Sequence, residues 1–317
     1  MRKKTILTLI LILSISLNAY LLHLTFIKKN TENQNPAQNS SPLRFVKPIN
    51  NNFIDSNISE SSHILHYADL KPSIESIIDS NATVGSITGF FLQDISTGAW
   101  LGNNEKEGFV PASLLKIPIA MTILKRVDRD EIKLTDTIEL TEEDLDNDAG
   151  NLYKKGAGTK LTFWEAIKIM ILTSDNTAKN ALKRQVSDAE INAIFTHIGI
   201  PNPYLTQNSA LVTPRGYIRI FKSLYFATFI SPELSEKLLD LATDTQTENL
   251  ISAGIPPEIQ VSHKYGERPD GLADCGIVYE PKNPYMLCIM TQNIEISEAK
   301  NLINSLSKTV FDYIHNK

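Results

Sequence analysis

Three short motifs follow one another along the chain, and their order constrains its fold more than any other sequence feature. They are Ser113-x-x-Lys116, Ser174-Asp175-Asn176 and Lys264-Tyr265-Gly266. A serine hydroxyl is a poor nucleophile until a base takes its proton, and a residue three positions later on a helix lies on the same face. Lys116 can therefore reach Ser113. A fold in which all three motifs meet would make one site for nucleophilic catalysis.

The surroundings of Ser113 separate the first motif from two other copies, which begin at Ser297 and Ser305. Ser113 follows Pro111 and opens an apolar run, residues 117–124, which predicts a buried helix that starts at a proline. A lysine acts as a base when burial and a neighbouring cation lower its pKa. The apolar run supplies the burial, and Lys264 can supply the cation.

The second motif follows Thr162 and Glu165, which have the spacing of a capping box, and a helical run over residues 166–172. Ser174 is therefore predicted in a turn between two helices, where it can relay a proton. The third motif begins a segment typical of a strand. Taken alone, the motifs are more often a chance match, a helix cap and an exposed lysine. The ordered set favours a shared site.

This set resembles the class A β-lactamases and penicillin-binding proteins. Other segments are similar to parts of the same fold, and they are residues 92–98, 140–145, 213–215 and 274–279. The resemblance covers about residues 63–317. It implies an α/β fold, a β-lactamase/transpeptidase-like sandwich of an antiparallel sheet with flanking helices. An all-helical lobe at about residues 112–253 is inserted into it.

The resemblance also implies a role for each residue of the site. Ser113 would be the nucleophile, Lys116 its base, and Ser174 the shuttle that carries a proton to the leaving nitrogen. The residues implied in substrate binding are Asn176 for the acyl-side amide, Lys264 for the carboxylate, and Tyr265, Gly266 and Glu267. Backbone N–H groups of Ser113 and Glu267 would form the oxyanion hole. The implied substrate is a β-lactam or a D-Ala-D-Ala-type peptidoglycan stem peptide, and no cofactor or metal is expected.

One departure from the family concerns the water that frees the acyl-enzyme. Class A enzymes activate it with a glutamate on an omega loop, but the matching stretch here, residues 201–212, contains no acid. Asp188 and Glu190 before it are better explained as a helix start. The acidic run at residues 142–148 is predicted to be a solvated surface. Without a positioned base, water attack loses on the order of a hundred to ten thousandfold, so we expect slow deacylation.

A second departure is Tyr265, where the family has threonine or serine. Alternate residues of a strand share a face, so Tyr265 and Glu267 are both expected to point to the ligand carboxylate. Either Arg268 neutralises Glu267, or the natural ligand lacks that carboxylate. Two alternatives to a β-lactamase stay open. One is a peptidoglycan D,D-peptidase or transpeptidase, and the other is a non-catalytic wall-binding module.

The N-terminal part predicts an attachment to a membrane. Residues 6–27 form an uncharged apolar run after three basic residues, long enough to span a bilayer core of about 30 Å. A cleaved signal peptide is the rival, although no small-x-small site ends the run. We expect residues 1–29 to be a retained single-pass anchor, residues 30–62 a flexible linker rich in Asn and Ser, and residues 63–317 an extracytoplasmic domain.

Composition and the remaining patterns complete the expectations. The chain has 31 Lys and Arg against 36 Asp and Glu, and no basic stripe with aromatics, which argues against nucleic acid as a partner. Cys275 and Cys288 are interpreted as cross-strand neighbours, either as a disulfide or as buried thiols. His63 and His66 are better explained as a helix start than as metal ligands. Oligomeric state is not indicated. The predicted elements are helices at 67–80 and 296–315 and strands at 85–94, 100–102, 261–264, 275–279 and 286–291.

Overall fold

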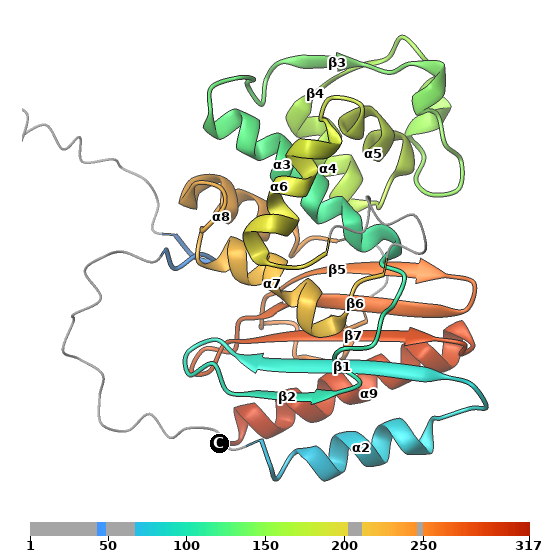
Figure 1. Cartoon of the computed structure of the whole chain (residues 1–317), viewed down its shortest axis with the longest axis vertical. Coiled ribbons are helices and arrows are strands. Elements are labelled where there is room, and N and C mark those ends of the chain that lie inside the picture. Colours follow the sequence, from blue (N-terminus) through green and yellow to red (C-terminus); the bar gives the residue numbers. More distant parts are fainter. Residues whose placement is uncertain (1–42, 49–66, 202–210, 246–249) are drawn as a thin grey trace, which may run out of the picture. The chain divides into compact units, whose positions relative to one another are not determined.

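A five-stranded antiparallel sheet organises the molecule (Figure 1). The computed structural model describes residues 43–48, 67–201, 211–245 and 250–317. The strand order is β2-β1-β7-β6-β5, from β2 (Trp100–Asn103) through β1 (Ile87–Asp94), β7 (Tyr285–Gln292) and β6 (Gly271–Val278) to β5 (Val261–Arg268). Strand β5 is therefore an edge strand, and the helical lobe lies beside it.

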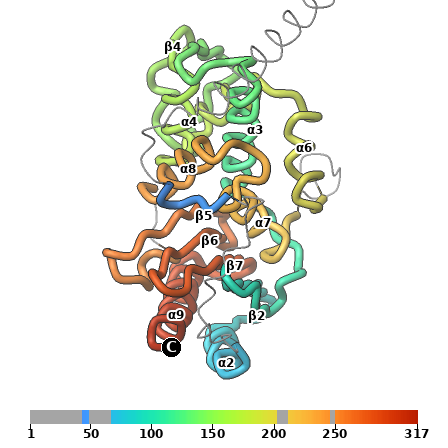
Figure 2. Tube along the Cα trace, turned by 90° about the vertical axis from the view of Figure 1, so that its left-hand side faces the viewer, coloured from blue at the N-terminus to red at the C-terminus, as the bar shows by residue number. Residues whose placement is uncertain are grey.

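Helices cover both faces of the sheet, as Figure 2 shows from the side. Helix α9 (Ile296–His315) packs on one face with α2 (Lys71–Ser80) beside it, and α7 (Pro214–Tyr225) packs on the other. Successive side chains of a strand point to opposite faces, so a strand buried on both sides is apolar throughout. In β7, Leu287 and Ile289 belong to the core under α9, whereas Met286 and Met290 belong to the core under α7. The predicted sandwich of sheet and flanking helices is confirmed.

The lobe is built around α3 (Lys116–Asp128), whose apolar residues from Ile117 to Leu124 are buried. Around it lie α4 (Phe163–Leu172), α5 (Asn176–Lys183), α6 (Asp188–Ile198) and α8 (Pro232–Leu241). Capping boxes start two of these helices, Thr162 with Glu165 at α4 and Ser187 with Glu190 at α6. The sequence predicted both helix starts correctly because a capping box is a local signal.

Two details of the predicted elements were wrong. The lobe is not wholly helical, because β3 (Thr137–Glu139) and β4 (Lys160–Thr162) form a small two-stranded sheet in it. Strand β5 continues to Arg268, so the third motif lies inside the strand and not at its start. The first error concerns pairing partners distant in sequence, Glu139 with Lys160, whereas in the second β5 extends to Arg268, which pairs with Gly271 across a tight turn.

Part of the predicted flexible linker packs against the domain, which corrects that prediction for residues 43–48. Phe45 and Val46 are buried, and the Phe45 ring lies 4.9 Å from the Tyr279 ring. The backbone N–H groups of Arg44 and Phe45 donate to the Glu236 carboxylate at 2.6 and 2.7 Å. The predicted anchor, the rest of the linker, and His63 and His66 lie outside the described residues. Within the described ranges, no helix is long and apolar enough to cross a membrane.

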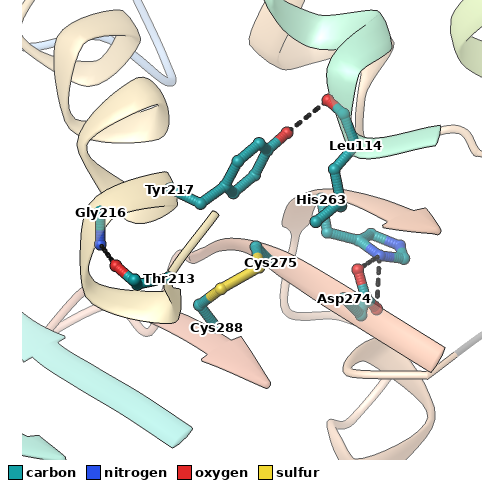
Figure 3. The surroundings of a disulfide bond; sticks show 8 residues. All are labelled: Leu114, Thr213, Gly216, Tyr217, His263, Asp274, Cys275 and Cys288. Carbon is teal, nitrogen blue, oxygen red and sulfur yellow. Dashed lines mark hydrogen bonds and ion pairs between the residues drawn. A yellow bond between two sulfur atoms is a disulfide. The ribbon is translucent and has the colours of Figure 1, made fainter. Parts of the chain in front are cut away.

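Strands β6 and β7 are joined by a disulfide between Cys275 and Cys288 (Figure 3). The two residues lie directly opposite each other in the antiparallel ladder, and both are buried. The sequence left a disulfide and a thiol pair open, and the structure contains the disulfide. It ties the centre of the sheet next to β5, the strand that carries the third motif.

Candidate active site

The turn that carries Ser113 has an unusual backbone. Ser113 lies in a 3-10 turn, Ala112–Leu115, that leads directly into α3. Ala112 has a φ of 46°, a left-handed value that costs a non-glycine residue about 1–3 kcal/mol and is concentrated at functional sites. The hydroxyl of Tyr217 on α7 donates to the Leu114 carbonyl at 2.7 Å, which holds the turn from below (Figure 3). Ser113 is thereby placed on a rigid turn.

Lys116 connects the first motif to the second. Its Nζ lies 3.0 Å from Ser113 Oγ, 3.1 Å from Ser174 Oγ and 2.9 Å from Asn176 Oδ1, and it also contacts the Ser174 carbonyl. The side chain is buried at 1% exposure. The predicted meeting of the two motifs is what the structure shows.

The second motif lies in the turn between α4 and α5, as the sequence predicted. Ser174 has a φ of 54°, the second strained non-glycine residue at this site. Asp175 caps α5, because its carboxylate accepts from Ala178 N at 2.9 Å and from Leu152 N at 2.8 Å. Asn176 donates from Nδ2 to Asp146 Oδ1 at 3.1 Å. A carboxylate only accepts, so this bond turns the amide oxygen toward Lys116.

Lys264 brings the third motif to the same place. Its Nζ donates to Ser174 Oγ at 3.1 Å and to the Tyr265 carbonyl at 3.0 Å, and it is 0% exposed. Ser174 Oγ therefore lies between the two lysines. We call Ser113, Lys116, Ser174 and Lys264 the lysine network.

Burial changes the protonation of both lysines. Burial lowers the pKa of Lys116 to about 8, and the neighbouring Lys179 adds to this effect. Burial, followed by repulsion from Lys116, lowers the pKa of Lys264 to about 7. An amine that loses its proton near neutral pH can act as a base. The burial that the sequence predicted lowers the pKa of Lys116, but the cation that adds to this effect is Lys179 and not the predicted Lys264.

Gly266 allows β5 to approach the nucleophile turn. A Cβ at this position would meet the Pro111 carbonyl at 2.8 Å and the Ser113 nitrogen at 3.2 Å. His263 donates its backbone N–H away from the sheet, to the Ala242 carbonyl. N–H directions alternate along an antiparallel strand, so the N–H of Glu267 also points to this free edge, beside Ser113.

Tyr265 and Glu267 both lie next to groups of the site, but in different surroundings. Glu267 lines the cavity at Ser113. The half-buried Tyr265 ring packs against the core under α9, and its face lies 4.3 Å from Lys264 Nζ. Arg268 pairs with Asp270 at 3.0 Å, so the proposed pairing of Arg268 with Glu267 is not observed.

The cavity that contains Ser113 has a volume of about 550 Å³. Two carboxylate residues line it in the described part of the chain, Asp148 and Glu267, and both are exposed. The stretch compared with an omega loop lies mostly outside the described residues, since 202–210 are not placed. No group of three or more His, Cys, Asp or Glu side chains in the described ranges is arranged to hold a metal ion.

The sequence missed two structural roles at this site. The acidic run is only partly solvated, because Asp144 is buried against Arg184 at 2.7 Å and Asp146 orients Asn176. Both contacts depend on α5, which the run does not adjoin in sequence. The second role belongs to His263, which directly precedes Lys264 in sequence. Its Nδ1 lies 2.9 Å from the Asp274 carboxylate. Only the pairing of β5 with β6 brings these two residues together.

Comparison with known proteins shows the family of the chain. Residues 69–314 match the model of the beta-lactamase enzyme family. A β-lactamase from Streptomyces albus G is 24% identical over 238 residues, which cover 68% of this chain and 76% of that protein. The β-lactamase VEB-1 from Pseudomonas aeruginosa is 23% identical over 236 residues, covering 66% of this chain and 79% of that protein.

Solved structures share the fold. A PBP-A mutant in an acyl-enzyme complex with penicillin G has a TM-score of 0.72 at 23% identity, covering 78% of this chain and 97% of that one. A β-lactamase from Sphaerobacter thermophilus DSM 20745 has a TM-score of 0.71 at 21% identity, with the same coverage of 78% and 97%. The match of the family model over most of the chain identifies this protein as a member of the β-lactamase enzyme family, the serine hydrolases of the β-lactamase and penicillin-binding type.

Proposed function

We propose that the chain forms an acyl-serine intermediate on Ser113 with β-lactams or D-Ala-D-Ala-type peptides, and that it releases the acyl group slowly. The observation that carries the proposal is the 3.0 Å distance between Lys116 Nζ and Ser113 Oγ inside a buried network. A mutant of PBP-A, which shares the fold, has been solved as an acyl-enzyme complex with penicillin G.

In the acylation step, Lys116 acts as the base. A neutral amine has two N–H donors and one lone pair. The Ser174 carbonyl and Asn176 Oδ1 can only accept, so they use both donors and leave the lone pair for the Ser113 hydroxyl. Ser113 Oγ then attacks the substrate carbonyl while its proton moves to Lys116. The N–H groups of Ser113 and Glu267 stabilise the oxyanion that forms.

Collapse of the tetrahedral intermediate requires a proton at the leaving nitrogen. Ser174 Oγ lies 3.1 Å from both Lys116 Nζ and Lys264 Nζ. It can therefore give its own proton to the leaving nitrogen and take a replacement from protonated Lys116. Lys264 keeps positive charge beside Ser174 when it is protonated. Asn176 has a second N–H for the acyl-side amide, because only one is used by Asp146.

Deacylation is the weak half of the cycle. Asp148 and Glu267 are the lining carboxylates among the described residues, and both are exposed, whereas Asp146 is engaged with Asn176. Lack of a positioned base slows water attack by on the order of a hundred to ten thousandfold. We therefore favour a penicillin-binding role or a D,D-peptidase over rapid β-lactam turnover.

The proposal includes a membrane tether. Residues 6–27 would form a single-pass anchor, with the catalytic domain on the extracytoplasmic side. Protease treatment of intact cells should digest the domain if it is outside. Protection of the domain until the cells are lysed would contradict this orientation.

One experiment tests the acyl-serine proposal directly. The full-length protein is mixed with benzylpenicillin and, separately, with a chromogenic cephalosporin, while protein mass and product are followed together. A persistent adduct on Ser113 with little product is the expected result, and Ser113→Ala should remove it. Sustained turnover would overturn slow deacylation. Absence of any adduct would instead favour a non-catalytic wall-binding module.

A further inference from the structure

The catalytic cavity extends from Ser113 along one side of α5. Asn176, Lys179, Asn180 and Lys183 all line it, and residues with these spacings share a helix face. Lys179 lies three residues beyond Asn176, or about 4.5 Å further along the helix axis at 1.5 Å per residue. The cavity thus continues from the reacting centre into a part walled by α5.

The three lysines that line this cavity differ in their partners. Lys116 is held in the lysine network, and Lys183 Nζ lies 2.7 Å from Asp188 Oδ1. Lys179 is half-buried, and its ammonium has no hydrogen bond or ion pair with any other described residue. Lys116 lies close enough that the charge of Lys179 lowers the Lys116 pKa.

The lining carboxylates do not neutralise Lys179. Asp148 and Glu267 are both exposed, and solvent screens exposed charges strongly. Glu267 also lies on β5, the wall that carries Lys264, and not on α5. A half-buried cation that faces both a cavity and a second cation is stabilised by an anionic ligand.

We propose that Lys179 determines specificity by binding a carboxylate on the acyl part of the substrate. The inference rests on the proposed acylation of Ser113, in which Asn176 binds the acyl-side amide and Ser174 serves the leaving nitrogen. Lys179 is on the Asn176 side, so a group that reaches it comes from the acyl half. The preferred acyl donors are therefore β-lactams with an acidic acyl side chain, or peptides with an acidic side chain next to the scissile bond.

A matched pair of penicillins tests this assignment. Carbenicillin is benzylpenicillin with one added carboxylate on its acyl side chain. The second-order rate constant for Ser113 acylation is measured by protein mass for both compounds, with the full-length protein in detergent. The quantity of interest is the ratio of carbenicillin to benzylpenicillin. Any effect of a substitution on Lys116 alters both rate constants and cancels in this ratio.

Lys179→Met should lower the ratio by about tenfold, the size of one charge-assisted hydrogen bond, and Lys179→Glu should lower it further. Lys183→Met is the matched control, because Lys183 lines the same cavity but is paired with Asp188, and it should leave the ratio unchanged. Added salt should lower the ratio in the wild type and have less effect in Lys179→Met.

The outcomes separate this inference from the proposed function. Adducts with an unchanged ratio in Lys179→Met and Lys179→Glu would overturn the inference alone. An equal fall in Lys183→Met would also overturn it, because the effect would then be one of general charge. If neither penicillin acylates Ser113 in the wild type, the proposed function is wrong, and the inference about Lys179, which rests on it, is wrong as well. Thermal unfolding of each variant shows that the protein is folded.

Discussion

Lys264 and His263 are consecutive residues of β5, and both are buried, but they have opposite kinds of surroundings. His263 has a carboxylate at 2.9 Å, Asp274, and its Nε2 lies 3.1 Å from Thr245 Oγ1. Asp274 also accepts from Ile251 N at 3.0 Å. Among the described residues, the hydrogen-bond partners of Lys264 Nζ are the Ser174 hydroxyl and the Tyr265 carbonyl, and its other close contact is the Tyr265 ring. Asp274 acts on Lys264 through its charge, without a hydrogen bond, and this is a smaller effect than burial and repulsion from Lys116. His263 thus has a carboxylate as a direct hydrogen-bond partner, and Lys264 has no carboxylate within hydrogen-bond distance among the described residues.

This difference indicates that His263 stabilises the fold, whereas Lys264 takes part in the chemistry of the site. A buried ionisable group without a counter-charge shifts its pKa toward the neutral form, and such shifts are concentrated at functional sites. A buried pair that satisfies several donors is costly to break, because removal of one partner leaves the other uncompensated. We expect changes in the lysine network to affect rate, and changes at His263 and Asp274 to affect stability.

The largest effect is expected for Lys116→Met. Loss of the base should reduce the acylation rate of Ser113 by on the order of a hundred to ten thousandfold. The free energy of unfolding should stay the same or rise, because a buried cation without a carboxylate partner is replaced by an apolar side chain. The acylation rate is measured by mixing the protein with penicillin and quenching the reaction at set times. The free energy of unfolding is measured by urea unfolding. A variant that loses several kcal/mol of stability but still acylates would reverse the comparison.

Asp274→Ala should show the opposite pattern. It leaves His263 and the Ile251 N–H without their acceptor in the core, so we expect the free energy of unfolding to fall by about 3–5 kcal/mol. The acylation rate per folded molecule should change by only a few fold. His263→Phe with Asp274→Ala should lose less than the sum of the single changes. Additive losses would mean that the pair is not coupled.

The sequence predicted the local elements of the fold better than the contacts between segments that are distant in sequence. Capping boxes, the buried run of α3 and the final helix depend on nearby residues, and they were predicted with nearly correct bounds. The meeting of Ser113, Ser174 and Lys264 was inferred from motif order. Three features were not inferred: the His263 and Asp274 pair, the bond from Asn176 to Asp146, and the lack of a hydrogen-bond or ion-pair partner for the Lys179 ammonium among the described residues. Each depends on register or helix rotation between segments distant in sequence, and no local pattern encodes them.

The pH dependence of acylation tests whether Lys116 is the base. Only its neutral form accepts a proton, and its pKa is lowered to about 8. The neutral fraction of Lys116, and the part of the acylation rate that depends on it, should therefore rise about tenfold per pH unit below 8 and level off above it. Loss of the Lys264 charge above about pH 7 is a separate effect, and Lys264→Met removes it from the profile. Thermal unfolding at each pH serves as the control for folding. A rate that is flat from pH 6 to 8 would exclude Lys116 as the titrating base.

The pH dependence of stability tests the compensation of Lys264. Its pKa is about 7 in the folded protein against 10.5 for the ordinary side chain, so the unfolded chain binds more protons between these values. The free energy of unfolding therefore rises with pH across that window, and the penalty is complete below pH 7. The comparison is between wild type and Lys264→Met in urea, where the variant should have the smaller slope. Equal slopes would show that Lys264 is fully compensated.

The smallest effect is expected at Glu267, a carboxylate on β5 that is exposed, whereas Asp274 on β6 is buried. Glu267→Gln should raise the acylation rate with benzylpenicillin by only a few fold, because solvent screens its repulsion of the ligand carboxylate. Stability should not change. The gain should disappear at high salt, which separates charge from shape. A large gain that persists in salt would mean that Glu267 reaches the lysine network, and that burial alone does not decide which charges on β5 govern the rate.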